Sequence, residues 1–251
     1  MRKTFIAMAL ISATSAPCAF ADTILGVYAG AQGWDMSTAG GFADDTTITQ
    51  FGFDSQTNGS IYAAFEHPVP FVPNIKINRT VLDTSGSTTL TSSFTFDGEL
   101  FTADTLVATN IDLTTTDYIL YYEIFDNDLV SIDIGINGKH VDGTLLVEDA
   151  ASSLTATQSF SGIVPMGYSR IAFGLPFTGL GVYAEGSYLA IDDSTVSDYQ
   201  IAITYSFIES LALDLTLQLG YRDTTVELDD LDNTYSDLTF DGAFAGIEFH
   251  F

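Results

Sequence analysis

The sequence predicts an all-β fold, an antiparallel up-and-down transmembrane β-barrel of about ten strands, with short periplasmic turns and long acidic extracellular loops. Three observations lead to this prediction. Apolar and polar side chains alternate along many segments, the connections between the segments alternate between short and long, and the chain opens with an apolar leader. Period-two alternation gives a strand two different faces, and alternating connection length is typical of bacterial membrane barrels.

The last segment, residues 238–251, alternates most clearly. One face carries Ala243, Ala245, Ile247, Phe249 and Phe251, and the other carries Gly242, Gly246, Glu248 and His250. A closing barrel strand ends in the aromatic girdle at the membrane interface. The run Gly246-x-x-Phe249-x-Phe251 also resembles the C-terminal sorting signal of bacterial outer-membrane barrels. We therefore expect these three residues to form the assembly signal; the alternative is an ordinary amphipathic edge strand.

The N-terminus has the features of a secretory signal peptide. Arg2 and Lys3 precede the apolar run Phe5 to Ala13, and Ala19-Phe20-Ala21 is a small-x-small cleavage site. The apolar run is too short to cross a membrane as a helix. We expect residues 1–21 to be removed and residues 22–251 to form a single barrel domain.

Composition narrows the possible partners. The leader removes two of the 7 basic residues, which leaves 5 against 33 acidic ones and a formal charge of −28. Such a charge disfavours direct binding to nucleic acid or to anionic surfaces. The content of 46% hydrophobic and 13% aromatic residues contradicts disorder. Acidic and apolar side chains must therefore be separated in space. Cleavage also removes Cys18, the single cysteine, so we expect no disulfide or thiol chemistry.

The first three strands are expected at residues 24–34, 60–66 and 75–82. Each places small or apolar side chains on one face and Tyr, Gln, Glu or Lys on the other. The stretch 67–74 between the second and third strands contains three prolines, which cannot donate to a ladder, so it reads as a stiff turn. Arg79 does not fit this assignment of faces, because its charged side chain falls on the lipid face. Either it snorkels to the outer interface, or a bulge turns it inward.

The middle strands are expected at residues 117–124 and 130–137, joined by the tight turn Asp126-Asn127-Asp128. The sixth and seventh are expected at residues 165–174 and 180–185, joined by a second turn over residues 175–179. The strands at residues 117–124, 130–137 and 180–185 carry rows of Leu, Ile, Val or Tyr on the outward face. Acidic and tyrosine side chains alternate with these rows, which predicts a polar lumen.

The eighth and ninth strands, residues 199–207 and 213–220, expose continuous rows of Ile, Tyr and Leu that water would not tolerate as a surface. The long connections lie on one side only, and they are expected over residues 35–59, 83–113, 138–158 and 222–237. A soluble sandwich would have polar outer faces, and a lipocalin-like barrel would be apolar inside. Ten strands with both ends on the turn side fit best, and eight strands are the main rival.

Four stretches resemble one uncharacterised family of small outer-membrane proteins of Gram-negative bacteria. These are residues Phe65–Pro70, Leu120–Asn127, Val164–Tyr168 and Leu175–Leu180. The resemblance spans most of the mature chain and lies mainly at the periplasmic turns. It implies a barrel in the outer membrane, and it carries no activity and no catalytic residue.

The inward faces predict a charged cluster in the lumen. Its expected members are Glu66, Lys76, Glu123, Asp133, Arg170 and Glu185, with Asp214 nearby. Side chains largely fill a small barrel, and buried charges must pair. We therefore expect Arg170 and Lys76 to bridge the carboxylates, with Tyr121, Tyr168 and Tyr183 hydrogen-bonded around them. Such a cluster would act either as a structural plug or as a gate that passes cations.

Enzymatic sites and metal sites are weakly indicated. His140 and Asp142 share a face near the outer rim, so an omptin-like general-base pair is geometrically possible. A lipid deacylase would need Ser, His and an acid facing the membrane, but no spacing singles out such a set. The acidic run at residues 229–233 lacks the glycine and the terminal Glu of a calcium-binding EF-hand loop. We expect no cofactor and no defined metal site, although acidic loops could collectively attract divalent cations.

These features predict an integral protein of the outer membrane of a Gram-negative bacterium. Its expected partners are membrane lipid, lipopolysaccharide, the barrel-insertion machinery and periplasmic chaperones, with no nucleic acid. The expected role is an envelope structural protein or a narrow, cation-preferring pore. A surface hydrolase and an adhesion or recognition protein are the alternatives.

Overall fold

The computed structural model describes residues 25–44, 47–127, 129–191, 194–208, 210, 213–231 and 234–251. Within these ranges every regular element is a strand. The expected signal peptide (residues 1–21) and the expected mature start at Asp22 lie outside the described residues. A helix long and apolar enough to cross a membrane does not occur in the described part of the chain.

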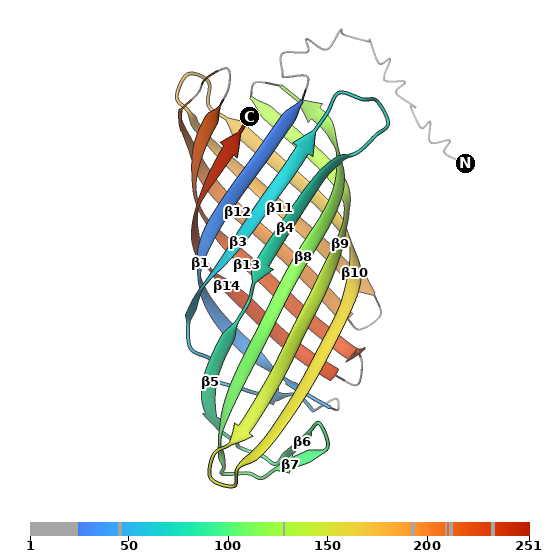
Figure 1. The fold of residues 1–251 in the computed structure, drawn as a ribbon, viewed down its shortest axis with the longest axis vertical. Coiled ribbons are helices and arrows are strands. Elements are labelled where there is room, and N and C mark those ends of the chain that lie inside the picture. The colour runs from blue at the N-terminus through green and yellow to red at the C-terminus, as the bar shows by residue number, and fades with distance from the viewer. Residues whose placement is uncertain are drawn as a thin grey trace, which may run out of the picture.

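Ten long strands form a closed antiparallel barrel (Figure 1). They are β1 (Gly26–Ala43), β3 (Gln56–Glu66), β4 (Asn74–Val81), β8 (Leu106–Asp126), β9 (Val130–Asp149), β10 (Leu154–Gly174), β11 (Leu180–Ile191), β12 (Ser194–Ile208), β13 (Asp214–Leu231) and β14 (Thr234–His250). Four short strands accompany them: β2 (Thr49–Gln50), β5 (Thr84–Thr89), β6 (Phe94–Phe96) and β7 (Glu99–Phe101). The prediction of a ten-stranded barrel is confirmed.

The last residue takes part in closing the barrel. β14 pairs with β1 from Tyr28↔His250 onward. The Phe251 amide then donates to the Val27 carbonyl at 2.9 Å, and the Val27 amide donates to the Phe251 carbonyl at 3.2 Å. The Phe249 and Phe251 rings stack with centroids 6.5 Å apart. Phe251 therefore adds two backbone bonds and an aromatic ring to the seam.

Deleting Phe251 is expected to lower the yield of assembled barrel sharply. The deletion removes both seam bonds and the terminal aromatic residue that the insertion machinery is expected to read. The measurement is the fraction of heat-modifiable barrel in the outer-membrane fraction. A Phe251→Tyr variant keeps the ring and should assemble normally. Wild-type yield from the truncated chain would contradict the proposed role of this residue.

An apolar band surrounds the outer wall on the half of the barrel that holds the C-terminus, which we expect to be the periplasmic half. Its exposed members include Ile61, Ile77, Leu120, Ile134, Ile136, Val182, Ile201, Ile203, Leu217 and Leu219, with Tyr118, Tyr188, Tyr199 and Tyr221 along its extracellular margin. Arg79 lies at this margin, exposed and in unbroken register between Ile61 and Thr116. No bulge turns it inward, so its guanidinium is placed to reach the interface.

Asn127 shapes one short periplasmic turn: its side-chain oxygen accepts the amides of Leu129 and Val130 at 2.8 Å each. In two other turns a proline precedes a phenylalanine in the left-handed region. Phe71 has a φ of 65° and Phe177 a φ of 66°, and both rings are exposed. These turns lie at the same end as the C-terminus (Figure 1). The expected turns at residues 67–74 and 175–179 are therefore present, although Asn74 is already the first residue of β4.

The strands run much further at the extracellular end than the sequence suggested. Most of residues 138–158 and 222–237, expected as loops, belong to β9, β10, β13 and β14. The prediction of loops is wrong because it assumes that a strand ends where its outward face becomes polar. Above the apolar band the alternation continues with its faces exchanged: polar side chains point outward and apolar side chains point inward. In β8, for example, Val107, Ile111 and Leu113 point inward, as in a water-soluble barrel.

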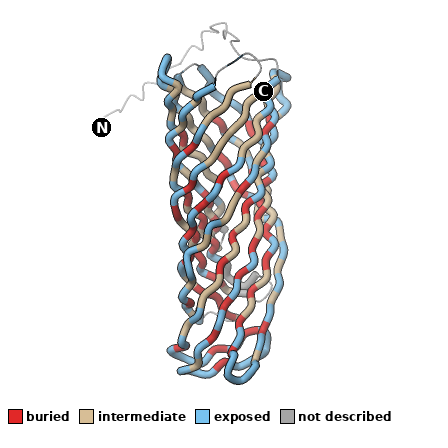
Figure 2. The backbone as a smooth tube through the Cα atoms, turned by 60° about the vertical axis from the view of Figure 1, so that its left-hand side comes forward, coloured by how far each residue is buried: buried red, intermediate tan, exposed pale blue. Residues whose placement is uncertain are grey.

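This inversion creates an apolar core inside the extracellular half. Its largest buried side chains are Phe42, Phe96, Phe101, Phe240, Phe244, Met36, Leu82, Leu90, Ile111, Leu113 and Leu145. Figure 2 shows buried positions concentrated in this lower part of the molecule. The β6–β7 hairpin contributes Phe94, Phe96 and Phe101 to the same cluster. The extracellular mouth is thus packed with aromatic rings.

Candidate functional site: the charged lumen

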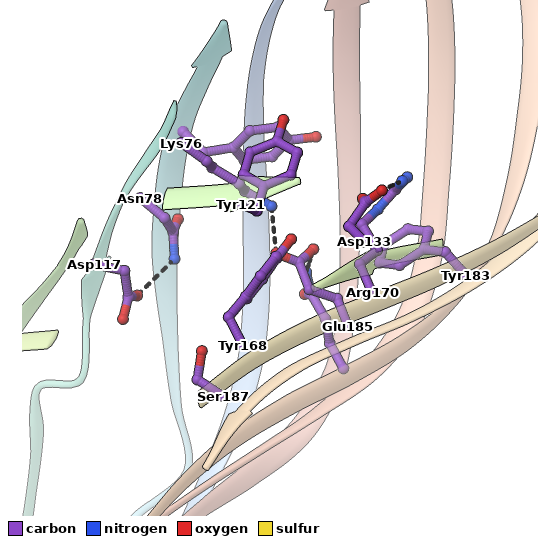
Figure 3. Close-up of polar contacts among 12 residues, drawn as sticks. Lys76, Asn78, Asp117, Tyr121, Asp133, Tyr168, Arg170, Tyr183, Glu185 and Ser187 are labelled. Atoms are coloured by element: carbon purple, nitrogen blue, oxygen red, sulfur yellow. Dashed lines mark hydrogen bonds and ion pairs between the residues drawn. The ribbon is translucent and has the colours of Figure 1, made fainter. Parts of the chain in front are cut away.

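The first charged layer lies toward the periplasmic end, and Figure 3 shows its side chains converging. The Lys76 Nζ lies 2.5 Å from the Glu185 Oε1. The same carboxylate accepts the Tyr168 hydroxyl at 3.2 Å and the Gln200 amide at 3.3 Å. Lys76 also lies over the ring of Tyr62, 4.8 Å from its centroid. Glu185 on β11 therefore accepts hydrogen bonds from the two adjacent strands, β10 and β12, and from β4 across the lumen.

A second pair lies beside the first. The Arg170 Nη1 is 3.7 Å from the Asp133 Oδ2, and its guanidinium lies 5.3 Å from the centre of the Tyr183 ring. Glu66 accepts the Tyr121 hydroxyl at 2.7 Å. Glu123 is exposed at the periplasmic end of β8, close to Glu66.

The six expected residues therefore divide into two ion pairs, a tyrosine-bound glutamate and a glutamate at the rim. Asp214 lies apart from them, 3.5 Å from the Nδ1 of His250. Whether this set of side chains has a function stays a prediction.

A deeper layer, which sequence reasoning missed, crosses the middle of the barrel. We call Asp117, Lys139, Asp198 and Arg222 the central tetrad. The Lys139 Nζ lies 2.7 Å from Asp117 and 2.8 Å from Asp198. Arg222 binds Asp198 through two nitrogens, Nε at 2.9 Å and Nη2 at 2.7 Å. The tetrad is buried and formally neutral, with two acids and two bases.

Neutral donors and acceptors complete the tetrad. Asn137 donates to Asp117 at 2.7 Å and Asn78 donates to it at 3.2 Å. Thr224 donates to Asp198 at 3.2 Å, and Arg222 donates to Thr80 at 3.2 Å. Burying charges is tolerable when they are both paired and hydrogen-bonded.

Sequence reasoning missed the tetrad for a specific reason. Lys139 and Arg222 fall just beyond the expected ends of the fifth and ninth strands, in segments read as loops. Continuing the inward parity of Asn137 to Lys139, and of Gly220 to Arg222, would have placed both bases in the lumen. Asp117 is the first residue of the expected strand 117–124, but no partner was predicted for it.

A hydrogen-bonded chain of uncharged side chains, which ends on the Glu248 carboxylate, links the walls near the seam. Tyr62 donates to Glu248 at 2.6 Å and accepts the Gln218 amide at 2.9 Å. Gln32 donates to Gln218 at 2.9 Å and accepts the Ser60 hydroxyl at 3.1 Å. This chain crosses β13, β14, β1 and β3, so it ties together the walls on both sides of the closing contact.

Little free space remains between the two charged layers. A cavity of about 30 Å³ lies there, bounded among others by Lys76, Asp117, Glu185, Asp198 and Arg222. A buried water needs a cavity of about 10–15 Å³, so this one has room for only about two. A larger vestibule of about 380 Å³ opens at the periplasmic end, between Arg170, Tyr183, Gln218 and Glu248. Solvent therefore reaches Arg170, whereas the layers beyond it are closed.

The enzymatic and metal candidates lie elsewhere. His140 and Asp142 occupy outward positions on β9, above the apolar band, and do not face the lumen. The His140 Nε2 lies 3.2 Å from the Ser161 Oγ on β10. Within the described ranges, no group of three or more His, Cys, Asp or Glu side chains is arranged to hold a metal ion.

Comparison with known proteins gives a likeness in fold. No family model and no curated protein matches the chain. The outer-membrane protease OmpT of Escherichia coli is 10% identical with a TM-score of 0.46, over 90% of this chain and 97% of that one. The transport unit of the Escherichia coli autotransporter AIDA-I is 7% identical with a TM-score of 0.41, over 96% and 92%. The Pseudomonas putida toluene transporter TodX is 7% identical with a TM-score of 0.33, over 92% and 90%. These values concern the barrel architecture alone.

Proposed function

We propose that this protein is a closed, non-conducting barrel of the outer membrane that serves as an envelope structural protein. One observation carries the proposal: the lumen is blocked at successive levels. From the periplasm inward these are the layer of Lys76 and Glu185, the central tetrad, and the aromatic core of the extracellular half.

The energetics support a permanent block. An ion can pass the central tetrad only if buried ion pairs separate, and removing one partner of a buried pair typically costs about 3–5 kcal/mol. Beyond the tetrad, the path would require several buried phenylalanines to leave a close-packed core. Neither rearrangement is expected to occur often without an external source of energy.

The apolar band, and the pairing of β1 with β14 up to Phe251, support the proposed location in the outer membrane. An exposed belt of Leu, Ile and Tyr is stable against lipid and unstable against water. The partners that follow from this location are outer-membrane lipid, the insertion machinery and periplasmic chaperones. Acidic side chains such as Asp112, Asp142 and Glu148 on the extracellular wall would approach lipopolysaccharide phosphates only with bridging divalent cations.

A narrow, cation-preferring pore is the second candidate, because acids exceed bases at the periplasmic entrance. Glu66, Glu123, Asp133 and Glu248 are found there with Arg170. Such an entrance would concentrate cations. For conduction, Arg170 would have to act as a gate in front of a path through the tetrad.

Single-channel conductance of refolded protein in planar bilayers distinguishes the two candidates. We expect no discrete currents from the wild type and none from Arg170→Ala, because the tetrad and the aromatic core remain closed. Arg170→Ala should lower only the unfolding midpoint, since it leaves Asp133 without its cationic partner. Cation-selective openings of the wild type, or larger and more frequent openings of Arg170→Ala, would overturn the closed-barrel proposal and support the gated pore.

A further inference from the structure

Two side chains suited to acyl-transfer chemistry meet on β9 and β10, which run side by side in the barrel wall (Figure 1). The His140 Nε2 lies 3.2 Å from the Ser161 Oγ, although the two residues are 21 positions apart in the chain. Serine hydrolases rely on such a contact, because the imidazole removes the hydroxyl proton while the serine oxygen attacks. The fold therefore brings together a nucleophile and a base that the sequence does not single out.

Both side chains point away from the lumen. His140 falls between Lys139 and Val141, which are buried inside the barrel, so its own side chain lies on the outer face. Ser161 is exposed and pairs in register with Asp142, another exposed outward residue of β9. Residues that pair directly across two strands lie on the same face of the sheet. A molecule outside the barrel therefore reaches this pair without entering the closed lumen.

The pair lies at the first polar level above the apolar band. Exposed Ile163 pairs in register with His140, and Tyr118, at the margin of the band, pairs with Gly138 two residues nearer the periplasmic end. Interfacial aromatic residues mark the boundary between the hydrocarbon and the headgroups of a membrane. At this boundary a lipid carries the ester groups that join its acyl chains to the headgroup. Ser161 is therefore placed at the depth of these esters, with apolar side chains beneath it.

Two neighbouring side chains on the same face complement the pair. Asp142 is the next outward residue of β9, roughly 7 Å beyond His140 at about 3.4 Å per residue. Its negative charge favours the imidazolium that forms when His140 accepts a proton. Thr116 on β8 pairs in register with His140 and carries a hydroxyl on the outer face. A hydroxyl donor is one of the groups that stabilise the negative oxygen formed when an ester is attacked.

We propose that Ser161 and His140 are the catalytic pair of an acyl-ester hydrolase on the outer wall, and that the substrate is a fatty acyl ester of a membrane lipid. Ser161 is the nucleophile and His140 is the general base and acid. The substrate class rests on the outer-membrane location proposed above, whereas the activity does not depend on whether the lumen is closed.

The reaction has two steps. First, the Ser161 Oγ bonds to the ester carbonyl carbon and its proton passes to the His140 Nε2, which is the acceptor when the imidazole proton is on Nδ1. The bond from this carbon to the lipid alcohol oxygen breaks, and the imidazolium gives its proton to that oxygen. In the second step His140 takes a proton from water, whose oxygen attacks the acyl-serine. The fatty acid leaves, and the proton returns to the Ser161 Oγ.

The test measures hydrolysis by the full barrel with three substrates: p-nitrophenyl butyrate in detergent, phospholipid vesicles that hold the barrel, and purified lipopolysaccharide. We expect the wild type to hydrolyse the soluble ester and to release fatty acid from one of the two lipids, which identifies the lipid source. Ser161→Ala and His140→Asn should each lower the rate at least about 100-fold, the lower end of what a general base contributes.

Ser159→Ala is the matched control. Ser159 is exposed on the same face of β10 and also shares a hydrogen bond, with Thr144 at 3.0 Å. Its loss should leave the rate unchanged. A fluorophosphonate probe, which bonds to activated serines, gives a readout without turnover: mass spectrometry should find the label on Ser161, and His140→Asn should abolish it. All three variants change side chains on the outer wall, so heat-modifiable barrel should form from each.

Three results would overturn the proposal. Folded wild-type barrel that shows neither hydrolysis nor labelling would mean that Ser161 is not activated. A wild-type rate from Ser161→Ala would assign the activity to another group. Hydrolysis of the soluble ester with no fatty acid released from either lipid would overturn the substrate class. The closed lumen is judged separately by conductance, and a barrel that hydrolyses the soluble ester but never inserts into vesicles would overturn the proposed location instead of the pair.

Discussion

Arg222→Met is expected to destabilise the barrel by about 3–5 kcal/mol, the usual effect of removing one partner from a buried ion pair. The substitution keeps most of the side-chain volume but removes both hydrogen bonds to Asp198. The tetrad then holds two carboxylates against Lys139 alone. The measurement is the urea midpoint of barrel unfolding in lipid vesicles, followed by the heat-modifiability shift.

Arg79→Met is the matched control, because it removes the same group from the outer wall. Arg79 is exposed at the margin of the apolar band and its loss should change stability little. The double variant Arg222→Met with Asp198→Asn restores neutrality to the tetrad and should recover part of the lost stability. If Arg222→Met and Arg79→Met had equal effects, the tetrad would not contribute to the stability of the fold.

Leu217→Arg is expected to cost about 2–4 kcal/mol, as a cation near the bilayer midplane of a barrel does. Leu217 is exposed on the outer face of β13, opposite Ile247 on β14. Its neighbours along the strand, Leu215 and Leu219, face the same way, and its partners across the ladder are Ile247 and Tyr205, so none of these neighbours offers an acid to compensate the charge. The measurement is again the unfolding midpoint in vesicles.

Thr216→Arg is the control one residue away. Thr216 faces the periplasmic vestibule and pairs in register with Glu248. An arginine at this position finds water and a carboxylate, so it should cost much less than Leu217→Arg. Equal costs at the two positions would mean that β13 is turned by one residue relative to this structure.

The lipid-facing side chains and the number of barrel strands could be predicted from the sequence alone. Alternation along a strand is a local property, so the outward rows of Ile, Leu and Tyr could be read residue by residue. The periplasmic turns could also be predicted from the sequence, because proline and Asn127 restrict the backbone locally. Even Arg79 could be recognised as an exception to the lipid face before its position at the margin was known.

The extracellular ends of the strands, and the pairing of charges in the lumen, depend instead on how the whole barrel folds. Above the apolar band the outer face of each strand meets water and the inner face meets an apolar core. A polar outward row therefore no longer marks the end of a strand. The partners in the lumen are distant in sequence: Lys139 and Asp198 are 59 residues apart, and Lys76 and Glu185 are 109 apart. Their contact depends on the closure and stagger of ten strands, and no local pattern encodes that geometry.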